Sequence, residues 1–391
     1  MKLFGRELRL GDPGVAEIVI FDDVNSHVVR QALPAGRTVA ILKVRPEDVR
    51  LGPRTLFHTA RLLLCRLSIA EARQHPHGVA RGLLFQCRCI YLEACLAAIA
   101  PRAVVTFIDN SGPWGWLSRH CRRFPFFAIQ NGTRLSYASA DRATYYCQHL
   151  FCFGSHETEH FPSLGYRVEQ FHPVGSLLAS LSFAPAAASA EQYDLLVVST
   201  WRGNIGFGQD VQDTMRSMRV MDERLAEYIR ARRLKAAVIL RAERGAQHWR
   251  MAELDATEED YYREVYGDAI AILDTDFVTR NVFPLMQRSR VIVSCLSTAL
   301  LEAFGIGKKV LYCNFTGTDR YHDHLAPDLV TTESERGPFF ARLDELRRMP
   351  DDEYARRFRP LQRHYMSNPA EPTYRAIATT IDAVIAGVAG R

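Results

Sequence analysis

The chain has 391 residues, of which 47% are hydrophobic and 24% are charged, so it can bury large cores and is not intrinsically disordered. Its length fits two domains of about 150–200 residues each. The formal net charge of +5 falls short of the dense Lys/Arg surface of a dedicated nucleic-acid binder, but it fits an anionic ligand or contact with an acidic membrane surface.

The first half of the sequence alternates short β-rich runs with helical stretches, which is the pattern of parallel βαβ units. Helices are expected at about 55–72 and about 79–99, the second ending at Pro101. The later β-rich runs end in small or polar residues, where an open parallel sheet places its ligand-facing loops. Strands are expected at 15–23, 38–44, 103–110, 126–132, 150–155 and 168–176.

A stretch rich in Ala, Pro and Ser at 183–192 has no apolar periodicity and is the best candidate for a linker. The alternating pattern restarts after it. Strands are expected at 194–200, 236–241, 269–274, 291–295, 308–314 and 328–332, and helices at about 209–233, 279–288, 298–306 and 371–388.

These elements predict an α/β protein with two Rossmann-like domains that face a cleft. The expected boundaries are 1–182 for the first domain, 193–370 for the second, and 371–391 for a C-terminal helix that could cross back to the first domain. Such a cleft would receive the loops of both sheets and would therefore hold the chemistry.

The most informative stretch of the second half is 291–315. An apolar strand ends at Ser294, a small polar turn follows with Ser297 and Thr298, and a helix then begins that carries Glu302 one turn in. The start of a helix offers unpaired N–H groups and a positive dipole end, which suit a phosphate, and Glu302 could accept bonds from ribose or sugar hydroxyls. In the alternative, Ser297 is only the N-cap of the helix and Glu302 lies on its solvated face.

Two arginines could support a phosphate site in this half. Arg202 and Arg241 both lie at the carboxyl ends of expected strands, where a guanidinium can fork onto a diphosphate. The commoner fate of an arginine is a salt bridge on the surface. The residues Glu243, Glu259 and Tyr262 could line the same site or belong to a solvated helix face.

The run S-x-x-S-T-x-x-x-E-A-x-x-x-G-K-K-V-L, which starts at Ser294, resembles the donor-site segment of GT-B-type glycosyltransferases and of the related nucleotide-sugar 2-epimerases. The resemblance covers about 25 residues. It implies that Ser294, Ser297 and Thr298 lie at the phosphates of the donor and that Glu302 holds a hydroxyl group. Polyol-phosphate transferases usually carry a His where this chain has Ser294, which weakens a polyol-phosphate interpretation.

The first half has a second group of candidates, at the ends of two expected strands. Asp109 could be a general base for an acceptor hydroxyl, or it could form an Asx-turn or a helix N-cap. The side chains around it could bind the acceptor or only form turns. These neighbours are Asn110, Ser111, Gln130, Asn131 and Thr133.

The phrases F-I-D-N-S-G, A-I-Q-N-G-T-R, F-G-S-H-E and P-V-G-S-L resemble bacterial surface-carbohydrate biosynthesis proteins, of capsule and lipopolysaccharide, which are thought to include GT-B-type transferases. Together with the second-half segment, the resemblance runs in scattered phrases from about 90 to 315. It favours a GT-B-like arrangement, with an acceptor-side first domain and a second domain that binds a nucleotide-sugar.

Several other features are set aside. His156 and His160 have the end spacing of a helical metal pair, but no third ligand is evident, and His322 and His324 could bind a ligand in the cleft. No P-loop motif occurs, and no G-x-G-x-x-G follows the first strand, which disfavours an NAD site. Arginines at 347–348, 356–357 and 359 form a basic helical face that could be solvated or could dock on an acidic membrane.

The nine cysteines are odd in number and include no C-x-x-C pair, so we expect buried free thiols in a reducing compartment. No run of about eighteen apolar residues occurs, and the N-terminus lacks the apolar segment of a signal peptide. We therefore expect a cytoplasmic protein without a transmembrane helix. It could act at the inner face of the membrane.

The prediction is a GT-B-like glycosyltransferase that moves a sugar from a nucleotide-activated donor to a surface-polysaccharide or lipid-linked acceptor. We expect no cofactor and no metal, since helix N–H groups and arginines can neutralise the leaving diphosphate. The expected partners are a nucleotide-sugar, a glycan or lipid-linked acceptor and an acidic membrane surface, but no nucleic acid. The alternatives are a nucleotide-sugar 2-epimerase or hydrolase on the same scaffold, and a non-catalytic sugar-nucleotide-binding protein.

Overall fold

The computed structural model describes residues 2–3, 6–44, 48–135, 145–183, 191–202, 209–241, 257–276, 280–367 and 371–389. Glu243 and most of the linker candidate lie outside the described residues. The chain forms two compact units. Unit 1 comprises 1–131, 140–177 and 369–391, and unit 2 comprises 132–139 and 178–368.

Unit 1 is built on a six-stranded sheet in which all neighbouring strands are parallel. Its order is β4-β3-β6-β7-β8-β9, so the order of the strands along the chain reverses between β3 and β6. The inner strands are fully buried apolar runs, as in a parallel sheet covered on both faces. The strands are β3 (Ile18–Phe21), β4 (Val39–Leu42), β6 (Ala103–Thr106), β7 (Phe126–Ile129), β8 (Tyr146–Cys152) and β9 (Arg167–Pro173).

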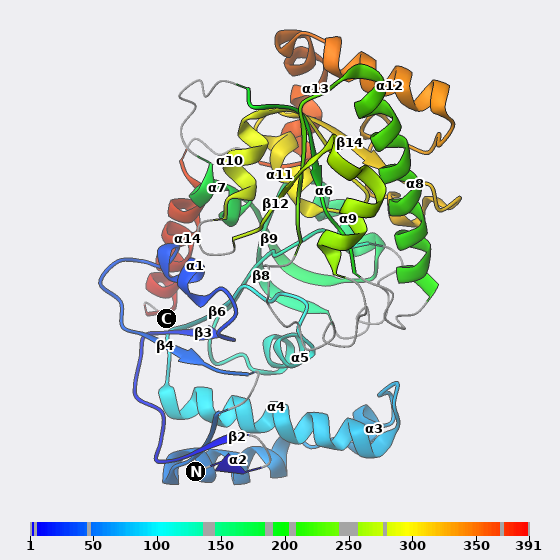
Figure 1. Ribbon diagram of the computed structural model, residues 1–391. Coiled ribbons are helices and arrows are strands. Elements are labelled where there is room, and N and C mark those ends of the chain that lie inside the picture. Colours follow the sequence, from blue (N-terminus) through cyan, green and yellow to red (C-terminus); the bar gives the residue numbers. More distant parts are fainter. Residues whose placement is uncertain are drawn as a thin grey trace. The chain divides into compact units, whose positions relative to one another are not determined.

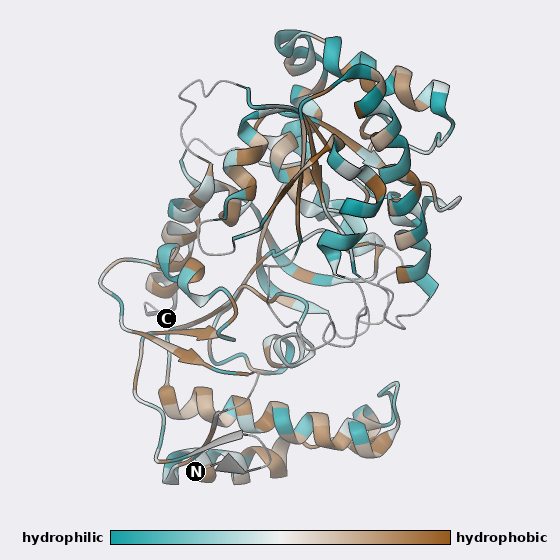
Figure 2. Ribbon diagram, viewed as in Figure 1, coloured by the Kyte–Doolittle hydropathy of each residue, from teal (hydrophilic) through white to brown (hydrophobic). Residues whose placement is uncertain are grey.

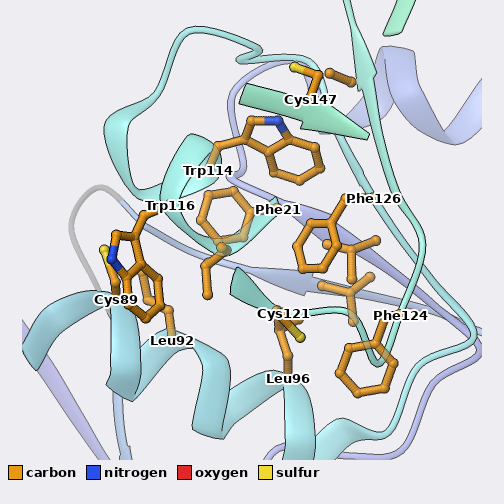
Figure 3. Close-up of a cluster of buried hydrophobic side chains, with 14 of the residues drawn as sticks. Phe21, Cys89, Leu92, Leu96, Trp114, Trp116, Cys121, Phe124, Phe126 and Cys147 are labelled. Carbon is orange, nitrogen blue, oxygen red and sulfur yellow. The ribbon is translucent and has the colours of Figure 1, made fainter. Parts of the chain in front are cut away.

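The core of unit 1 lies where two helices meet this sheet. Figure 3 shows Trp114 next to Phe21 and Phe126, with ring centroids 5.6 Å and 5.3 Å away, and Leu92 and Leu96 belong to the same cluster. Edge and tilted aromatic contacts of this kind add to the stability gained from burial. Unit 1 includes the helices α1 (Ser26–Gln31), α4 (Val79–Ile99), α5 (Gly112–His120) and α6 (His156–Ser163), and α7 (Leu177–Ser182) marks the boundary with unit 2.

Helix α4 has the bounds that the sequence predicts, and it is the one described helix that is long and apolar enough to cross a membrane. In its most apolar window, 61% of the residues are buried inside the protein. The buried side includes Cys89, Leu92 and Leu96, which belong to the aromatic core. Core helices of proteins that do not span membranes have the same length and composition, so this feature is weak evidence for a span.

A small layer at the N-terminus was not predicted. The strands β1 (Lys2–Leu3), β2 (Arg6–Leu10) and β5 (Asp48–Leu51) form a three-stranded sheet. The helix expected at 55–72 is two helices, α2 (Pro53–Arg66) and α3 (Ile69–Ala72). They separate because Leu67 is extended and Ser68 caps α3 by accepting a bond from the Glu71 N–H.

The C-terminal helix α14 (Thr373–Ala389) belongs to unit 1, which confirms that the chain crosses back. It buries Ile377, Ile381 and Ile385, one every four residues. The Thr373 hydroxyl donates to the Val174 carbonyl at 2.7 Å. The first α/β unit is therefore completed by the last helix of the chain.

Unit 2 contains a second parallel six-stranded sheet, whose strands are the brown central arrows of Figure 2. Its order is β12-β11-β10-β13-β14-β15. Numbered along the unit, this is 3-2-1-4-5-6, the Rossmann order, in which ligands bind beyond the carboxyl ends of the strands where the order reverses. Here that point lies between β10 and β13. The strands are β10 (Tyr193–Val198), β11 (Ala236–Ile239), β12 (Ala271–Leu273), β13 (Ser289–Ser294), β14 (Lys309–Cys313) and β15 (Val330–Thr331).

Helices cover both faces of this sheet. Figure 1 shows α10 and α11 on one side and α8 and α9 on the other, and α11 contacts β13 and β14 directly. Two helices, α12 and α13, carry the arginines predicted as a basic face near the C-terminus. The helices of unit 2 are α8 (Gln209–Arg232), α9 (Glu258–Tyr266), α10 (Val282–Gln287), α11 (Thr298–Gly305), α12 (Arg336–Arg348) and α13 (Asp351–Tyr365).

Candidate functional site

Three neighbouring strands bring the predicted donor-binding residues of unit 2 to one edge of its sheet. Arg241 follows β11, Arg202 follows β10, and the turn with Ser297 and Thr298 follows β13. These strands are paired in the order β11-β10-β13. The residues therefore gather at the carboxyl edge, on both sides of the point where the strand order reverses.

The two arginines are close enough to affect each other. Burial lowers the pKa of Arg241, and the positive charge of Arg202 lowers this pKa further, while the Glu258 carboxylate opposes the shift. The Arg241 guanidinium donates to the Trp201 carbonyl at 3.2 Å. Repulsion between two guanidinium groups would be relieved by a bound anion such as a diphosphate.

Glu258 is a residue that sequence reasoning missed. Its carboxylate accepts bonds from the Arg241 N–H, at 2.8 Å, and from the Ser199 hydroxyl. It therefore ties the carboxyl ends of β11 and β10 together. The available signal was a capping box at the start of α9, where Thr257 and Asp260 exchange bonds, because this box sets the first turn of the helix against the sheet edge.

The turn after β13 is partly used for its own structure. Ser297 is the N-cap of α11, and its Oγ accepts from the Ala299 N–H at 3.3 Å. Ser297 therefore acts as an N-cap, as the alternative from the sequence expected. Its hydroxyl proton is still able to donate a hydrogen bond to a ligand. Ser294 is fully buried, and its Oγ donates to the Val198 carbonyl at 2.7 Å. That bond joins β13 to β10, and it fits a structural role better than direct contact with a ligand.

Thr298 contacts a segment that precedes it by more than 160 residues. Its Oγ1 accepts from the Thr133 N–H at 3.1 Å and lies 3.3 Å from the Thr133 hydroxyl. A Cβ added to Gly132 would lie 3.3 Å from the same Oγ1. The segment that starts at Gly132 belongs to unit 2, so the structure brings a predicted acceptor residue and a predicted donor residue together within one unit.

Glu302 is nearly buried, with 5% of its surface exposed, so the solvated-face alternative does not hold. Its negative charge acts on Arg280, whose pKa is lowered by burial and raised in part by Glu302. Arg280 has a positive φ of 51° and donates to the Ser182 hydroxyl at 3.4 Å. Arg280 is a second charged residue near this turn that sequence reasoning missed.

The other candidates of this half divide clearly. Glu259 pairs with Arg263 along α9 at 2.6 Å, as a solvated helix face does, and Tyr262 is fully buried. Asp274 and Asp276, after β12, form a D-x-D pattern. The expectation of a metal-free site did not take this triplet into account. Within the described residues, no group of three or more His, Cys, Asp or Glu side chains is placed to hold a metal ion.

The candidates of unit 1 surround the point where the order of its own sheet reverses. Asp109 follows β6 and is 1% exposed, and it accepts a bond from the Tyr145 hydroxyl at 2.8 Å. It is not the cap of α5, because Ser111 holds the N-cap position. Asn110 is exposed beside it.

Asp22 lies at the end of β3, the neighbour of β6, and was not singled out in the sequence. Its φ is 80°, which is strained for a residue other than glycine. Its carboxylate accepts from the Val24 N–H at 3.2 Å, and 1% of its surface is exposed. Two buried aspartates therefore follow the two strands at which the order of the unit 1 sheet reverses.

The Gln130 side chain serves the fold of unit 1. It is 2% exposed, donates to Glu157 at 3.3 Å and accepts from the Phe153 N–H at 2.9 Å. Its amide therefore ties the end of β7 to the segment after β8. The neighbouring Asn131 is half-buried and is the better candidate for direct contact with an acceptor.

The remaining histidines and cysteines show no metal site in the described part of the chain. His156 and His160 stack with centroids 5.0 Å apart on α6, and His322 contacts the Asn314 side chain. All nine cysteines are free thiols, and seven of them are buried, as predicted. The exposed ones are Cys65 and Cys87.

The fold of the whole chain resembles three solved structures. The UDP-GlcNAc 2-epimerase of Neisseria meningitidis bound to UDP-GlcNAc matches with a TM-score of 0.53 and 12% identity, over 96% of this chain and 99% of that one. The wall teichoic acid polymerase TagF matches with a TM-score of 0.51 and 10% identity, over 97% and 91%. UGT89C1 of Arabidopsis thaliana matches with a TM-score of 0.50 and 12% identity, over 97% and 99%.

No protein-family model matches the sequence, and no curated protein matches it. The structural likenesses confirm the predicted GT-B fold with its two parallel-sheet α/β domains. The neighbours include both glycosyltransferases and UDP-GlcNAc 2-epimerases of this fold. At identities this low the fold fits either kind of enzyme.

Proposed function

We propose that this protein, a chain of GT-B fold, is a glycosyltransferase that moves a sugar from a nucleotide-activated donor to a surface-polysaccharide or lipid-linked acceptor. The observation that carries the proposal is the pair of arginines after β10 and β11, beside the start of α11, at the reversal point of a Rossmann sheet. Two guanidinium groups and a helix start at one sheet edge suit a diphosphate.

The donor is assigned to unit 2. Arg202 and Arg241 pair with the diphosphate, and the hydroxyls of Ser297 and Thr298 donate to its oxygens. Glu302 accepts a bond from a ribose or sugar hydroxyl. This assignment is supported by the adjacency of β11, β10 and β13.

The acceptor is assigned to residues that follow the strands of unit 1, with Asp109 as the base. The acceptor oxygen bonds to the anomeric carbon as the bond from this carbon to the diphosphate oxygen breaks. The nucleoside diphosphate leaves with that electron pair, and the acceptor proton passes to the Asp109 carboxylate. The Tyr145 hydroxyl, hydrogen-bonded to Asp109, positions the carboxylate, and Asn110, Asn131 and Thr133 bind the acceptor.

The setting of the reaction is also part of the proposal. The protein acts in the cytoplasm at the inner face of the membrane, where lipid-linked acceptors lie, and it uses no metal because arginines and helix N–H groups balance the departing charge. The triplet at 274–276 makes metal dependence a necessary check. Turnover that stops with EDTA and returns with Mg²⁺ would contradict the metal-free part.

The experiment starts with a thermal-shift screen of nucleotide-sugars, followed by calorimetry and by product formation on oligosaccharide and lipid-linked acceptors. Arg241→Ala and Glu302→Gln should weaken donor binding about tenfold to a hundredfold, since each removes a charge-assisted hydrogen bond. Arg263→Ala, at an exposed arginine of α9, is the matched control. The donor assignment fails if both variants bind the donor as the wild type does.

Catalysis is separated from binding by Asp109→Asn. We expect kcat to fall by about a hundredfold or more with an unchanged donor Kd, which is the typical contribution of a general base. Tyr145→Phe keeps the ring stacked on Tyr166, at 4.3 Å between centroids, and removes only the hydroxyl. Its effect on kcat should be smaller than that of Asp109→Asn.

A 2-epimerase is the second candidate, because a solved UDP-GlcNAc 2-epimerase with its nucleotide-sugar aligns over nearly the whole chain. An epimerase or hydrolase would convert the donor in the absence of any acceptor, whereas a transferase would need one. A non-catalytic binding protein would bind the donor tightly, show no turnover and tolerate Asp109→Asn. The same assay therefore distinguishes all three.

A further inference from the structure

We propose that the outward face of α2 is a docking surface for an anionic lipid bilayer. This face, which we call the α2 ridge, consists of Leu56, Phe57, Ala60, Leu64 and Leu67. The proposal concerns membrane attachment and does not depend on the reaction proposed above. It also places the attachment on unit 1, whereas the arginines of α12 and α13 belong to unit 2.

The ridge is apolar and open to solvent. The exposed fraction is 51% for Leu56, 64% for Phe57 and 90% for Leu64, and Leu67 at the C-cap is 44% exposed. Leu56, Ala60 and Leu64 recur every four residues, and therefore lie in one row along the helix. Most surface positions of a helix carry polar side chains, so a continuous apolar row marks an interaction site.

The orientation of α2 is fixed, so the ridge cannot turn inward. The Asp12 carboxylate accepts bonds from the N–H groups of Thr55, at 2.8 Å, and Arg54, at 3.2 Å, at the start of the helix. Leu62 and Leu63 of the same helix pack against the core of unit 1. The apolar row is thus the outer side of a helix that is held at its first turn and along its inner face.

Further exposed apolar side chains lie on α3 and α4. Ile69 is 58% exposed, and Leu84 is 71% exposed. The Gln86 side chain on α4 exchanges two bonds with the backbone of Ser68, at 2.8 Å and 3.0 Å, and thereby holds the junction between α2 and α3. This N-terminal layer is therefore a fixed platform.

The positive charge of the protein is concentrated in the same segment. Residues 53–99, from the start of α2 to the end of α4, contain six arginines, at 54, 61, 66, 73, 81 and 88, and two acidic residues, Glu71 and Glu93. Their net charge of +4 makes up most of the +5 of the entire chain. Arg61, Arg73 and Arg81 are exposed. These positive charges also act on His58. Its pKa is lowered first by burial and then by the charges of Arg123, Arg61 and Arg54.

An apolar row flanked by arginines matches a helix that lies in the headgroup region of a bilayer. The apolar side chains enter the boundary of the acyl chains, and the arginines bind anionic headgroups. A second copy of this chain would suit the ridge less well, because two such faces would bring like charges together. The charge pattern therefore favours an anionic lipid surface over self-association.

The test is co-sedimentation of the full-length chain with vesicles of phosphatidylcholine alone and with vesicles that also contain phosphatidylglycerol. We expect binding to the anionic vesicles that weakens with added salt. A triple variant with Leu56→Ser, Phe57→Ser and Leu64→Ser should bind about tenfold or more weakly, since three exposed apolar side chains lose their contact with lipid. Arg61→Gln with Arg73→Gln and Arg81→Gln should lose the preference for anionic vesicles.

The matched control is Arg348→Gln with Arg356→Gln and Arg359→Gln, which removes three exposed charges from unit 2 and should leave vesicle binding unchanged. Circular dichroism and thermal melting establish that all variants are folded. Loss of binding in this control but not in the α2 variants would overturn the proposal. Absence of wild-type binding to anionic vesicles would also overturn it, as would a dimer in sedimentation analysis that the ridge variant turns into a monomer without change in vesicle binding.

Discussion

His149 and His172 lie on neighbouring strands of the unit 1 sheet, and their ring nitrogens Nδ1 and Nε2 are 3.2 Å apart. The His149 ring also stacks on Phe127, with centroids 4.6 Å apart. Burial lowers the pKa of His149 to about 4, and the positive charge that His172 can carry contributes to the shift. Single residues of this kind decide how the protein responds to acid.

We expect His149 to make unfolding easier as the pH falls from about 6.5 to 4. In the unfolded chain His149 binds a proton near pH 6.5, whereas in the folded state it binds one only near pH 4. The stability that is present above pH 6.5 is therefore lost across this window. Because the ring is partly exposed, the loss is about 1–2 kcal/mol. Urea unfolding at several pH values should show a smaller acid-induced loss in His149→Phe than in the wild type.

The comparison with the variant matters because Asp222 acts in the opposite direction. Burial raises the pKa of Asp222 to about 7, against the hydrogen bonds from Tyr261 and Tyr266, so the folded state gains stability from this group as the pH falls from 7 to 4. Equal acid slopes in the wild type and in His149→Phe would contradict the role assigned to His149.

The helices α3 and α4 pack closely at a glycine. Gly82 of α4 lies directly against the backbone of Ala72 in α3. A Cβ added to Gly82 would lie 2.5 Å from the Ala72 carbonyl oxygen and 2.8 Å from its Cα. Backbone atoms cannot move aside as a flexible side chain can. The platform that carries the α2 ridge therefore depends on a glycine within a helix.

We expect Gly82→Ala to lower the free energy of unfolding by about 1–3 kcal/mol, the usual cost of forcing an atom into a packed interface. Gly387→Ala in α14 is the matched control, because an added Cβ meets nothing within 4 Å there. That control should raise stability by about 0.5–1 kcal/mol through helix propensity. Urea denaturation measures both, and an equal gain in the two variants would show that α3 and α4 can separate without cost.

At the scale of the whole molecule, unit 1 is assembled from chain segments that are far apart in the sequence. Its sheet is complete by residue 173, yet α14 supplies three buried isoleucines and an ion pair in which Arg37 and Asp382 are 2.7 Å apart. Burying three such side chains contributes several kcal/mol, about 1.5–3 for each. Unit 1 is therefore complete only after the chain has passed through unit 2.

Deletion of residues 371–391 should destabilise unit 1 while leaving unit 2 folded, because α14 belongs to unit 1. Hydrogen exchange followed by mass spectrometry should show faster exchange in β3 and β6, the two strands of the unit 1 sheet between which the strand order reverses. Peptides from β10 and β13 are the internal control. Exchange that rises equally in both units would mean that they unfold as one cooperative body.

Much of the fold could be predicted from local patterns, because apolar runs and helix signals depend on residues close together in sequence. The bounds of α4 follow from its apolar run and Pro101, and β11 lies within its predicted strand, while β10 and β13 overlap theirs and begin one and two residues earlier. The layer of β1, β2 and β5 could not be recognised, since its short strands carry no distinctive pattern. The break at Leu67 was hidden because both flanking segments are helical.

For the candidate site, the sequence by itself determined which residue types follow which strands: Arg202, Arg241 and the Ser297 cap. Only the tertiary structure decided that β10 lies between β11 and β13 and so makes these residues neighbours. It also buried Ser294 and placed Thr133 on Thr298. The physical reason is that strand order and long-range hydrogen bonds join residues far apart in the sequence, 165 positions in the case of Thr133 and Thr298, and no local pattern of side chains encodes such pairings.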